Sequence, residues 1–272
     1  MPELPEVEVI ARGLSQTLAG RTVISVKVPG LTRLSDAAEV IVPGVQGQTI
    51  CRVYRRAKVL LIELENESTL VFHLKMTGRV VHGERRDINK HDRIVFVLDD
   101  GSWLIFSDMR KFGYVKLFTK QLLENWDFLQ KIGPEPLESS PAELVERIAG
   151  RKTSIKGLLL NQSVVAGVGN IYADESLFRA GIHPETKGHR IGHERALKLF
   201  AELQDVLKLA IRENGSSISD YVNAHGDAGA FQNSFNVYGK KGQQCSRCNG
   251  LLQAVKVAGR TSTFCPHCQP RR

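Results

Sequence analysis

The sequence lacks any run of about 20 apolar residues, which excludes an ordinary membrane-spanning helix. Its start, MPELPEVEV, lacks the apolar core that a secretory signal needs, so we expect a cytoplasmic protein with no membrane partner. Cysteine is scarce. Four of the five cysteines form two Cys-x-x-Cys pairs near the end, and without an export signal this spacing favours a metal site over disulfides.

Acidic residues are absent from residues 237–272, which hold seven lysines and arginines. The whole chain has a formal charge of +8 and a pI of about 9.3. Four thiolates and one Zn²⁺ would still leave the last segment at about +5. A module with this charge is attracted to phosphate, so the sequence favours a polyanionic partner.

The order of patterns along the chain predicts an α+β protein. An amphipathic helix opens the chain, with Pro5 in its first turn and Gly20 at its end. Segments rich in β-branched and aromatic residues follow, which predicts an antiparallel sandwich carrying that helix; they are 23–28, 59–64, 70–74, 94–98 and 103–106. Beyond the Gly-Pro-Glu-Pro segment at 133–136 the pattern is helical, over 141–149, 154–161, 171–180 and 193–212. We therefore expect three domains, at 1–131, 132–236 and 237–272.

The two cysteine pairs give the strongest structural signal. They are separated by 16 residues and can place four thiolates tetrahedrally around one structural Zn²⁺, at Cys245, Cys248, Cys265 and Cys268. Such a site stabilises a small hairpin by roughly 10–16 kcal/mol. His267 is not needed as a ligand, and Cys51 is interpreted as an ordinary buried thiol. The segment between the pairs predicts two strands turning near Gly259, with Arg260 at the tip, where it is either solvated or in contact with DNA.

The N-terminus offers a candidate nucleophile. Removal of Met1 would expose the nitrogen of Pro2, and an α-amine has a pKa of about 8 against about 10.4 for lysine. A secondary amine that attacks an aldehyde-like carbon gives a cationic iminium. Glu3 and Glu6 lie within one helical turn and could move protons or balance charge. The alternative is that Pro and Glu simply begin a helix well.

The segment NQSVVAGVGNIYADE at 161–175 contains a glycine turn between two expected helices. Its Gly-Val-Gly run follows no strand, so we reject a nucleotide-cofactor site. Asn170 is expected at the N-cap of the following helix, where capping alone could explain it. Helix N-termini also present N–H groups to phosphate, which makes a contact with a DNA backbone the other interpretation.

Basic and bulky residues also occur together in the sandwich domain, at 55–58, 73–76, 91–92 and 108–113. Arg, Met and Phe on loops could wedge into a base stack. From composition alone, Met76 and Phe112 are expected to be core residues.

Together these pieces resemble the formamidopyrimidine-DNA glycosylases, bacterial enzymes that remove oxidised purines from DNA. The resemblance covers the chain from end to end. It rests on the motifs MPELPEVE at the start, RRAK at 55–58, HLKMTG at 73–78, KHD at 90–92, DMRKFG at 108–113, GPEP at 133–136, VVAGVGNIYADESLF at 164–178, GIHP at 181–184, VYGKKG at 237–242 and the terminal cysteine pairs.

The resemblance implies the fold and the chemistry. The fold would be an N-terminal helix with a β-sandwich, a helical domain with a helix-two-turn-helix, and a Cys₄ zinc-finger hairpin. The activity would be bifunctional: Pro2 displaces the damaged base through an iminium, and β- and δ-elimination then cut the strand as an abasic-site lyase. The substrate would be duplex DNA with 8-oxoguanine or a formamidopyrimidine opposite cytosine. We expect a monomer in the bacterial cytoplasm, associated with the nucleoid through DNA.

The resemblance also implies roles for particular residues. Pro2, Glu3, Glu6 and Lys58 would be catalytic. DNA-binding residues would be Lys58, Met76, His91, Arg110, Phe112, Lys156, Asn170, Tyr238 and Arg260, with Met76, Arg110 and Phe112 filling the vacated stack. A loop with Ser216, Ser217, Ile218, Ser219 and Tyr221 would cover the damaged base. Departures from the family pattern are Asn214 in place of glycine, the pair Ser219-Asp220, and Thr261-Ser262 after Arg260.

Two alternatives stay open. One is the related endonuclease VIII type, which removes oxidised pyrimidines; MPELPE and an intact Met76, Arg110 and Phe112 set favour the purine enzyme. The other is a non-catalytic damage-binding paralogue, which would keep the fold and the charge without needing Pro2, Glu3 or Glu6.

Overall fold

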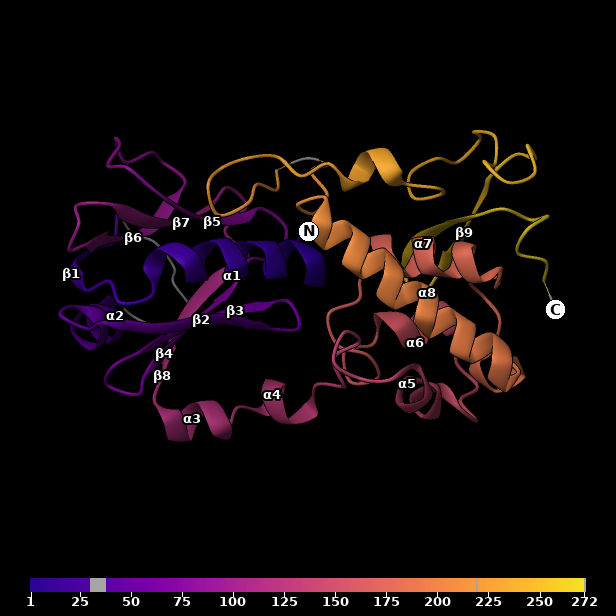
Figure 1. Cartoon of the computed structure of the whole chain (residues 1–272), viewed down its shortest axis with the longest axis horizontal. Coiled ribbons are helices and arrows are strands. Elements are labelled where there is room, and N and C mark those ends of the chain that lie inside the picture. The colour runs from indigo at the N-terminus through magenta and orange to yellow at the C-terminus, as the bar shows by residue number, and fades with distance from the viewer. Residues whose placement is uncertain (30–37, 219, 272) are drawn as a thin grey trace. The chain divides into compact units, whose positions relative to one another are not determined.

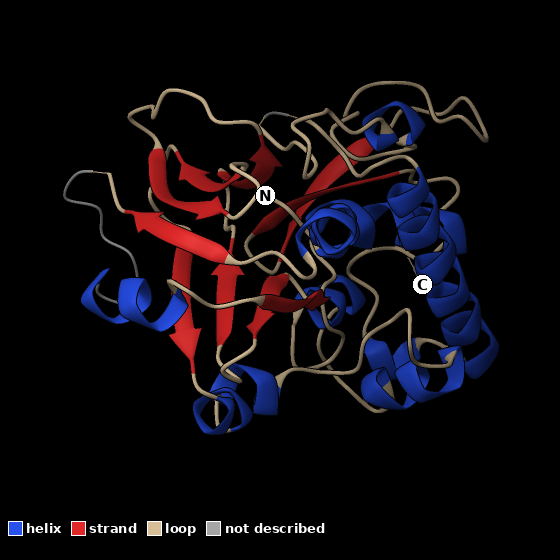
Figure 2. Cartoon of the chain, turned by 60° about the vertical axis from the view of Figure 1, so that its left-hand side comes forward, coloured by secondary structure: helices blue, strands red, loops and turns tan. Residues whose placement is uncertain are grey.

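The structure is a computed structural model that describes residues 1–29, 38–218 and 220–271 (Figure 1). The chain forms two compact units. The first comprises residues 1–130 and 213–232, and the second comprises residues 131–212 and 233–272. Most strands belong to the first unit and the longer helices after α1 to the second (Figure 2).

The first unit is an antiparallel sandwich of two four-stranded sheets. One sheet has the order β1-β6-β7-β5, with β1 (Val23–Lys27), β5 (Gly78–Gly83), β6 (Asp92–Leu98) and β7 (Trp103–Asp108). The other has the order β2-β3-β4-β8, with β2 (Ile50–Arg56), β3 (Val59–Leu64), β4 (Thr69–His73) and β8 (Tyr114–Phe118). Phe72 of the second sheet meets Phe96 and Phe106 of the first edge-on, at 6.2 and 5.8 Å between ring centroids. These contacts join the inner faces of both sheets into one core.

Helix α1 (Leu4–Leu18) belongs to the same core. Its apolar residues recur every three or four positions, so Val7, Ile10, Leu14 and Leu18 all fall on one face and are fully buried. That face packs with side chains from both sheets. The packing fixes the direction of the helix and thereby the position of the chain's first residues.

The second unit is helical and ends in a hairpin. Its helices are α5 (Pro141–Ile148), α6 (Ile155–Leu160), α7 (Asn170–Ala180) and α8 (His193–Arg212), with a 3₁₀ turn η1 (Gly188–Arg190). α5 begins with a capping box between Ser140 and Glu143, and α7 ends at Gly181 with φ of 68°, a conformation that favours glycine. The hairpin pairs β9 (Gln253–Val257) with β10 (Arg260–Phe264). Its turn has positive φ at both Ala258 and Gly259, the pattern of a tight two-residue hairpin.

The fold class expected from the sequence is confirmed, and several details differ. The patterns missed β2, β5, β8 and the short helices α2 (Ala38–Val45), α3 (Lys120–Glu124) and α4 (Asp127–Lys131), as well as the 3₁₀ turn η2 (Phe231–Ser234). Cys51 is exposed, so its interpretation as a buried thiol is wrong. Because β2 shifts register between Ile50 and Arg52, Cys51 lies at an irregular position of the strand.

The compact units differ from the three-part division of the sequence. Residues 213–232 return to the sandwich, and the hairpin packs with the helices through a cluster that includes Phe178, Leu252 and Cys265. The three domain boundaries stay a prediction.

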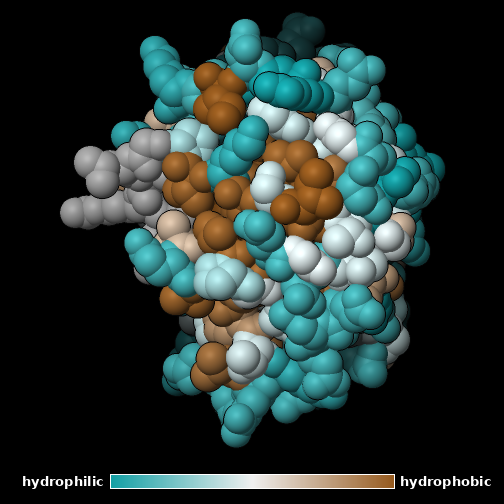
Figure 3. Space-filling model, turned by 90° about the vertical axis from the view of Figure 1, so that its left-hand side faces the viewer, coloured by the Kyte–Doolittle hydropathy of each residue, from teal (hydrophilic) through white to brown (hydrophobic). Residues whose placement is uncertain are grey.

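Among the described residues no helix is long and apolar enough to cross a membrane. Apolar side chains gather among polar ones on the face of the first unit drawn in Figure 3. Exposed apolar residues of this unit include Ile24 on β1 and Val40 on α2.

Candidate functional site

The start of α1 holds two carboxylates in a fixed arrangement. Glu3 is the N-cap residue and forms a capping box with Glu6, in which the backbone N–H of Glu3 donates to Oε2 of Glu6 at 2.9 Å. Both glutamates and Pro2 are buried. Three of the four residues that the resemblance assigned to catalysis are therefore held together at one helix end.

A loop from far along the chain reaches the same helix end. The backbone N–H of Ser216 donates to Oε1 of Glu6 at 2.9 Å, and the hydroxyl of Tyr221 donates to the backbone oxygen of Glu6 at 3.4 Å. Burial, and the nearby Glu6 carboxylate, raise the pKa of Tyr221 well above its ordinary value. Glu6 thus joins the expected base-covering loop to the helix that carries Pro2.

Side-chain hydrogen bonds also shape the loop itself. The hydroxyl of Ser217 donates to the backbone oxygen of Tyr221 at 2.7 Å and accepts from the N–H of Gly229 at 2.8 Å. Asn214, which stands where the family pattern has glycine, has φ of 60°, so its backbone adopts the left-handed conformation nonetheless. Ile218 is exposed. Ser219 lies outside the described residues.

One end of the β2-β3-β4-β8 sheet gathers basic residues. Lys58, in the two-residue turn between β2 and β3, is buried, and its neighbour Ala57 has φ of 51°. His73 pairs with Val59 across the sheet, and its Nδ1 accepts from the N–H of Lys75 at 3.1 Å. Burial, helped by the charges of Lys75 and Lys58, lowers the pKa of His73 to about 3. The imidazole is therefore neutral at physiological pH.

The neutral His73 makes the first unit sensitive to acid. Its folded pKa lies below the ordinary value of 6.5, so protonation favours the unfolded chain. Stability from this group is fully present above pH 6.5 and falls by about 1.4 kcal/mol per pH unit as pH drops through 6.5 toward 3. His73→Gln should reduce this slope in urea unfolding curves measured at several pH values. An unchanged slope would contradict the assignment.

Met76, Arg110 and Phe112 lie together on the surface. The side chains of Met76 and Phe112 are 44% and 56% exposed, so the expectation from composition that they are core residues is wrong. The guanidinium of Arg110 lies 5.1 Å from the ring centroid of Phe112, and its Nη1 donates to the sulfur of Met76 at 3.2 Å. An arginine and two apolar side chains thus form one exposed group.

Asp108 holds this group in place, although no role was expected for it from the sequence. Its carboxylate accepts from the hydroxyl of Thr77 at 2.5 Å, from the N–H of Arg110 at 3.2 Å and from the N–H of Gly113 at 2.7 Å. A Cβ at Gly113 would lie 2.9 Å from the Phe106 ring, so only glycine fits. The signal was present, because DMRKFG begins with this aspartate and ends with this glycine.

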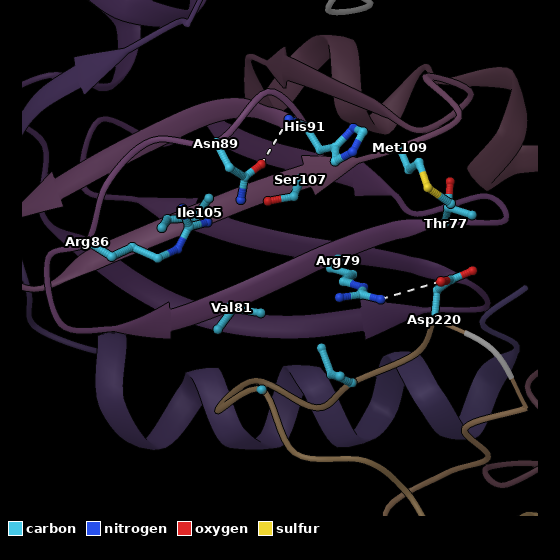
Figure 4. Close-up of a pocket in the computed structure, with 12 residues that line it drawn as sticks. Thr77, Arg79, Val81, Arg86, Asn89, His91, Ile105, Ser107, Met109 and Asp220 are labelled. Carbon is cyan, nitrogen blue, oxygen red and sulfur yellow. Dashed lines mark hydrogen bonds and ion pairs between the residues drawn. The ribbon is translucent and has the colours of Figure 1, made fainter.

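His91 lines a pocket of about 290 Å³ in the first unit. Figure 4 shows the ion pair between Arg79 and Asp220, which are 3.5 Å apart, on one side of the pocket and His91 with Asn89 on another. Nearby, the guanidinium of Arg86 donates two hydrogen bonds, of 2.8 and 2.9 Å, to the carboxylate of Asp92. Burial opposes ionisation of Asp92, but the bonds from Arg86, Ser107 and the backbone of Asn89 outweigh it and lower its pKa. The KHD motif thus uses Asp92 to fix the loop that carries His91.

In the second unit Asp174 joins α7 to the hairpin. Its carboxylate accepts from Nζ of Lys156 at 2.7 Å, from the hydroxyl of Ser262 at 2.6 Å and from the N–H of Thr263 at 3.0 Å. The backbone oxygen of Thr261 accepts from Nζ of Lys156 and from Nδ2 of Asn170, both at 3.2 Å. Within the departure Thr261-Ser262, Ser262 contributes a side-chain hydroxyl to this network, whereas Thr261 contributes only a backbone oxygen.

Two expectations on these residues are corrected. Lys156 was expected to contact DNA, but its side chain is fully buried against Asp174, so it offers no cation to an outside phosphate. Asn170 was expected as the N-cap of α7, but Gly169 takes that position and Asn170 is the first helical residue. Its Oδ1 is buried and has no hydrogen-bond partner among the described residues. Arg260 is exposed at the start of β10, as expected of the hairpin tip.

The buried pair predicts a large stability effect. Lys156→Met would leave the Asp174 charge without its cation, which costs about 3–5 kcal/mol in a buried pair. The exposed Lys152→Met, with the same change of side chain, should shift stability by less than about 0.5 kcal/mol. Urea unfolding of both variants checks this; equal stabilities would contradict it.

Glu175, next to Asp174, fixes the VYGKKG segment. Its carboxylate accepts from the backbone N–H groups of Asn236, Val237 and Tyr238, each at 2.9 Å. Tyr238 is half-buried, with its ring against Phe235. Two adjacent buried acids in a helix are rare, but their burial depends on the fold, so the sequence alone gives no signal for Asp174 and Glu175.

The four expected metal ligands converge. The sulfurs of Cys245, Cys248, Cys265 and Cys268 all lie within 4.8 Å of one another. The Cys248–Cys265 and Cys245–Cys268 pairs are 3.5 and 3.9 Å apart, and thiolates about 2.3 Å from a tetrahedral zinc have edges of about 3.8 Å. The N–H groups of Arg247 and Cys268 point at cysteine sulfurs. This donor set fits one zinc ion, and His267 is not part of it.

Family models match along the chain. The formamidopyrimidine-DNA glycosylase N-terminal domain matches residues 1–115, the H2TH domain of the same glycosylases matches 132–222, and the zinc finger found in FPG and IleRS matches 242–271. With the cysteine geometry, the last match confirms the prediction of one structural zinc ion.

Similar proteins agree with these matches. The formamidopyrimidine-DNA glycosylase of Nitratidesulfovibrio vulgaris is 40% identical over 99% of this chain and all of its own, and that of Geobacillus kaustophilus is 41% identical with the same coverage. A solved complex of Lactococcus lactis Fpg with abasic-site DNA is 36% identical, covers 99% of this chain and all of its own, and has a TM-score of 0.91. A complex of a Lactococcus lactis FPG mutant with Fapy-dG DNA has the same identity and coverage and a TM-score of 0.92. The chain therefore belongs to the formamidopyrimidine-DNA glycosylase family of enzymes.

Proposed function

We propose that this chain excises oxidised purines, 8-oxoguanine and formamidopyrimidines, from duplex DNA and then cleaves the abasic site by β- and δ-elimination. The observation that carries the proposal is the arrangement of Pro2, Glu3 and Glu6 at the start of α1, joined through Glu6 to the loop at Ser216. Solved relatives in complex with Fapy-dG DNA and with abasic-site DNA support it. The remaining expectations, a monomer in the bacterial cytoplasm and cytosine opposite the lesion, stay predictions.

The chemistry begins with removal of Met1, which turns the amide nitrogen of Pro2 into a secondary amine. Its lone pair attacks C1′ of the damaged nucleotide, the bond from C1′ to the base breaks, and the base leaves with the electron pair and a proton. Loss of the nitrogen's proton and opening of the sugar at O4′ then give an iminium between C1′ and Pro2. The iminium acidifies C2′, so elimination expels first the 3′ and then the 5′ phosphate, and water releases Pro2.

The two glutamates have different roles: Glu3 transfers protons, and Glu6 stabilises positive charge. Glu3, adjacent to the nucleophile, protonates O4′ as the sugar ring opens and later takes the C2′ proton. Glu6 accepts hydrogen bonds from the backbone N–H groups of Glu3 and Ser216, which hold its carboxylate in place to stabilise the iminium charge. Lys58, buried in the turn after β2, supplies a further positive charge near a phosphate.

The substrate nucleotide must leave the helix before its C1′ can be attacked, at a cost of a few kcal/mol. Met76, Arg110 and Phe112 offset this cost by filling the vacated stack, with Arg110 facing the unpaired cytosine. Ser216, Ser217, Ile218, Ser219 and Tyr221 form the loop over the flipped base. His91, Asn170, Tyr238 and Arg260 contact the backbone.

Borohydride trapping on an 8-oxoguanine:cytosine duplex tests the proposal. Reduction of the iminium should join the wild-type chain covalently to DNA, because the intermediate carries a reducible C=N bond. Pro2→Gly should give little adduct. Peptide mapping should place the bond on the nitrogen of residue 2, and intact mass should show Met1 removed.

A duplex with thymine glycol provides the comparison, since a solved complex of Lactococcus lactis Fpg contains an oxidized pyrimidine. Faster excision of thymine glycol than of 8-oxoguanine would reject the purine assignment in favour of the endonuclease VIII type. An adduct mapped to an internal lysine would reject the Pro2 mechanism. Binding of both duplexes without any excision would identify a non-catalytic paralogue.

A further inference from the structure

Two segments of the second unit pair along their backbones and present exposed cations. The N–H of Ile155 donates to the oxygen of Thr186 at 2.7 Å, and the N–H of Gly188 donates to the oxygen of Thr153 at 3.0 Å. A further bond of 2.9 Å joins the N–H of His189 to the oxygen of Arg151. The exposed cations on the two segments are Arg151, Lys152, Lys187 and Arg190.

The C-terminal segment adds a fifth cation to the same surface. Exposed Arg271 pairs with Glu185 at 3.0 Å, and both line a hollow of about 320 Å³ with Thr186, Lys187 and Arg190. We call the surface formed by Arg151, Lys152, Lys187, Arg190 and Arg271 the basic strip. Its five positive charges exceed the single negative charge of Glu185 by four. A hollow lined in this way favours a polyanion over a neutral or acidic ligand.

The basic strip begins beside the tip of the hairpin. A Cβ at Gly157 would lie 3.2 Å from the Thr153 side chain and 3.7 Å from Cβ of Ala258, in the turn that presents Arg260. Thr153 and the turn of the hairpin therefore both lie beside Gly157, and the 185–190 segment is hydrogen-bonded to residues 151–155. Arg260, a phosphate contact of the proposed function, follows Ala258 by two residues.

We propose that the basic strip binds the sugar-phosphate backbone of duplex DNA flanking the lesion, beyond the nucleotides that Arg260 contacts. The inference rests on the proposed function and adds the surface that contacts the duplex beyond the lesion. Spaced lysines and arginines on a polar surface suit a phosphate backbone, which they contact without reading sequence. Only a duplex long enough to reach the basic strip can contact it. The contribution of the strip to DNA affinity therefore depends on the length of the duplex.

The test compares two duplexes that carry the same tetrahydrofuran abasic-site analogue, one ending a few base pairs beyond it and one extending well past it on both sides. Affinity is measured at salt concentrations from roughly 50 to 200 mM, where the slope of log K against log salt reports the number of phosphates that the protein neutralises. The wild-type slope should be steeper for the long duplex. Lys187→Gln/Arg190→Gln should lower the long-duplex slope by about 0.9 for each phosphate that is no longer neutralised and leave the short-duplex slope unchanged.

Lys198→Gln/Lys208→Gln is the matched control, because it removes the same charge from exposed positions on α8. It should keep the wild-type slopes on both duplexes. The inference is overturned if the strip variant keeps the wild-type long-duplex slope, if its slope falls equally on both duplexes, or if the control behaves like it. A wild-type chain that binds neither duplex would overturn the proposed function, and the inference with it.

Discussion

Glu3→Gln is expected to lower the single-turnover rate of base excision by about 10²–10⁴-fold, the contribution usual for a positioned acid or base. Glutamine keeps the size of the side chain and can still accept the hydrogen bond of the capping box, so α1 should begin as before. It cannot donate or accept the proton that opening of the sugar requires. Because a preformed abasic site is already an aldehyde, it should still form an iminium with Pro2. The measurement is excision from an 8-oxoguanine duplex beside borohydride trapping of the iminium at a preformed abasic site.

Glu8→Gln is the matched control on the same helix. Glu8 is bound by Arg12 at 2.6 Å and Arg55 at 2.7 Å and lies over one turn beyond Glu3. Its substitution removes an equal charge near the N-terminus without touching the proton donor, and excision should fall by less than about tenfold. Equal losses in both variants would mean that Glu3 acts through overall charge or helix stability, and a normal excision rate in Glu3→Gln would remove it from the mechanism.

Much of the fold followed from local patterns. The 193–212 helix was predicted with its observed bounds, because its apolar residues repeat at helical spacing over five turns. The zinc ligands followed from their spacing. By contrast, β5 and β8 contain Gly78, Gly83 and alternating polar residues, so their pairing with β7 and β4 depends on distant partners. The return of residues 213–232 to the sandwich likewise rests on contacts such as that of Ser216 with Glu6, which no local pattern encodes.

Residues of the candidate site were predictable where one sequence motif contains them. They were not predictable where a contact with a residue elsewhere in the chain determines whether the side chain is buried or exposed. MPELPE placed Pro2, Glu3 and Glu6 together because they share one helix end. Lys156 looked like a DNA-binding cation, and only the fold shows that Asp174, eighteen positions later, buries it. Exposure of Phe112 is similar: the aromatic residue suggested a core, but the Asp108 carboxylate holds its loop at the surface.

Cys265→Ser is expected to release the zinc and to weaken binding to a lesion duplex by at least about tenfold at moderate salt. The metal contributes roughly 10–16 kcal/mol to such a site, whereas a lone two-stranded hairpin is marginal in water. Without zinc the β9–β10 pairing frays, and Arg260 and the Thr261 backbone lose their fixed positions. The bonds from Ser262 and Thr263 to Asp174 hold one strand but not the turn. Zinc content by mass spectrometry and a duplex titration on the same sample measure both effects.

Cys51→Ser supplies the control, since Cys51 is exposed on β2 and is not part of the four-sulfur cluster. It loses one thiol, as Cys265→Ser does, but should retain one zinc per chain and the wild-type affinity. If Cys265→Ser loses its zinc and still binds the duplex as tightly as wild type, the zinc-stabilised hairpin does not contribute to DNA affinity. If the variant keeps its zinc, three sulfurs and an outside ligand suffice, and the affinity should then stay close to that of the Cys51→Ser chain.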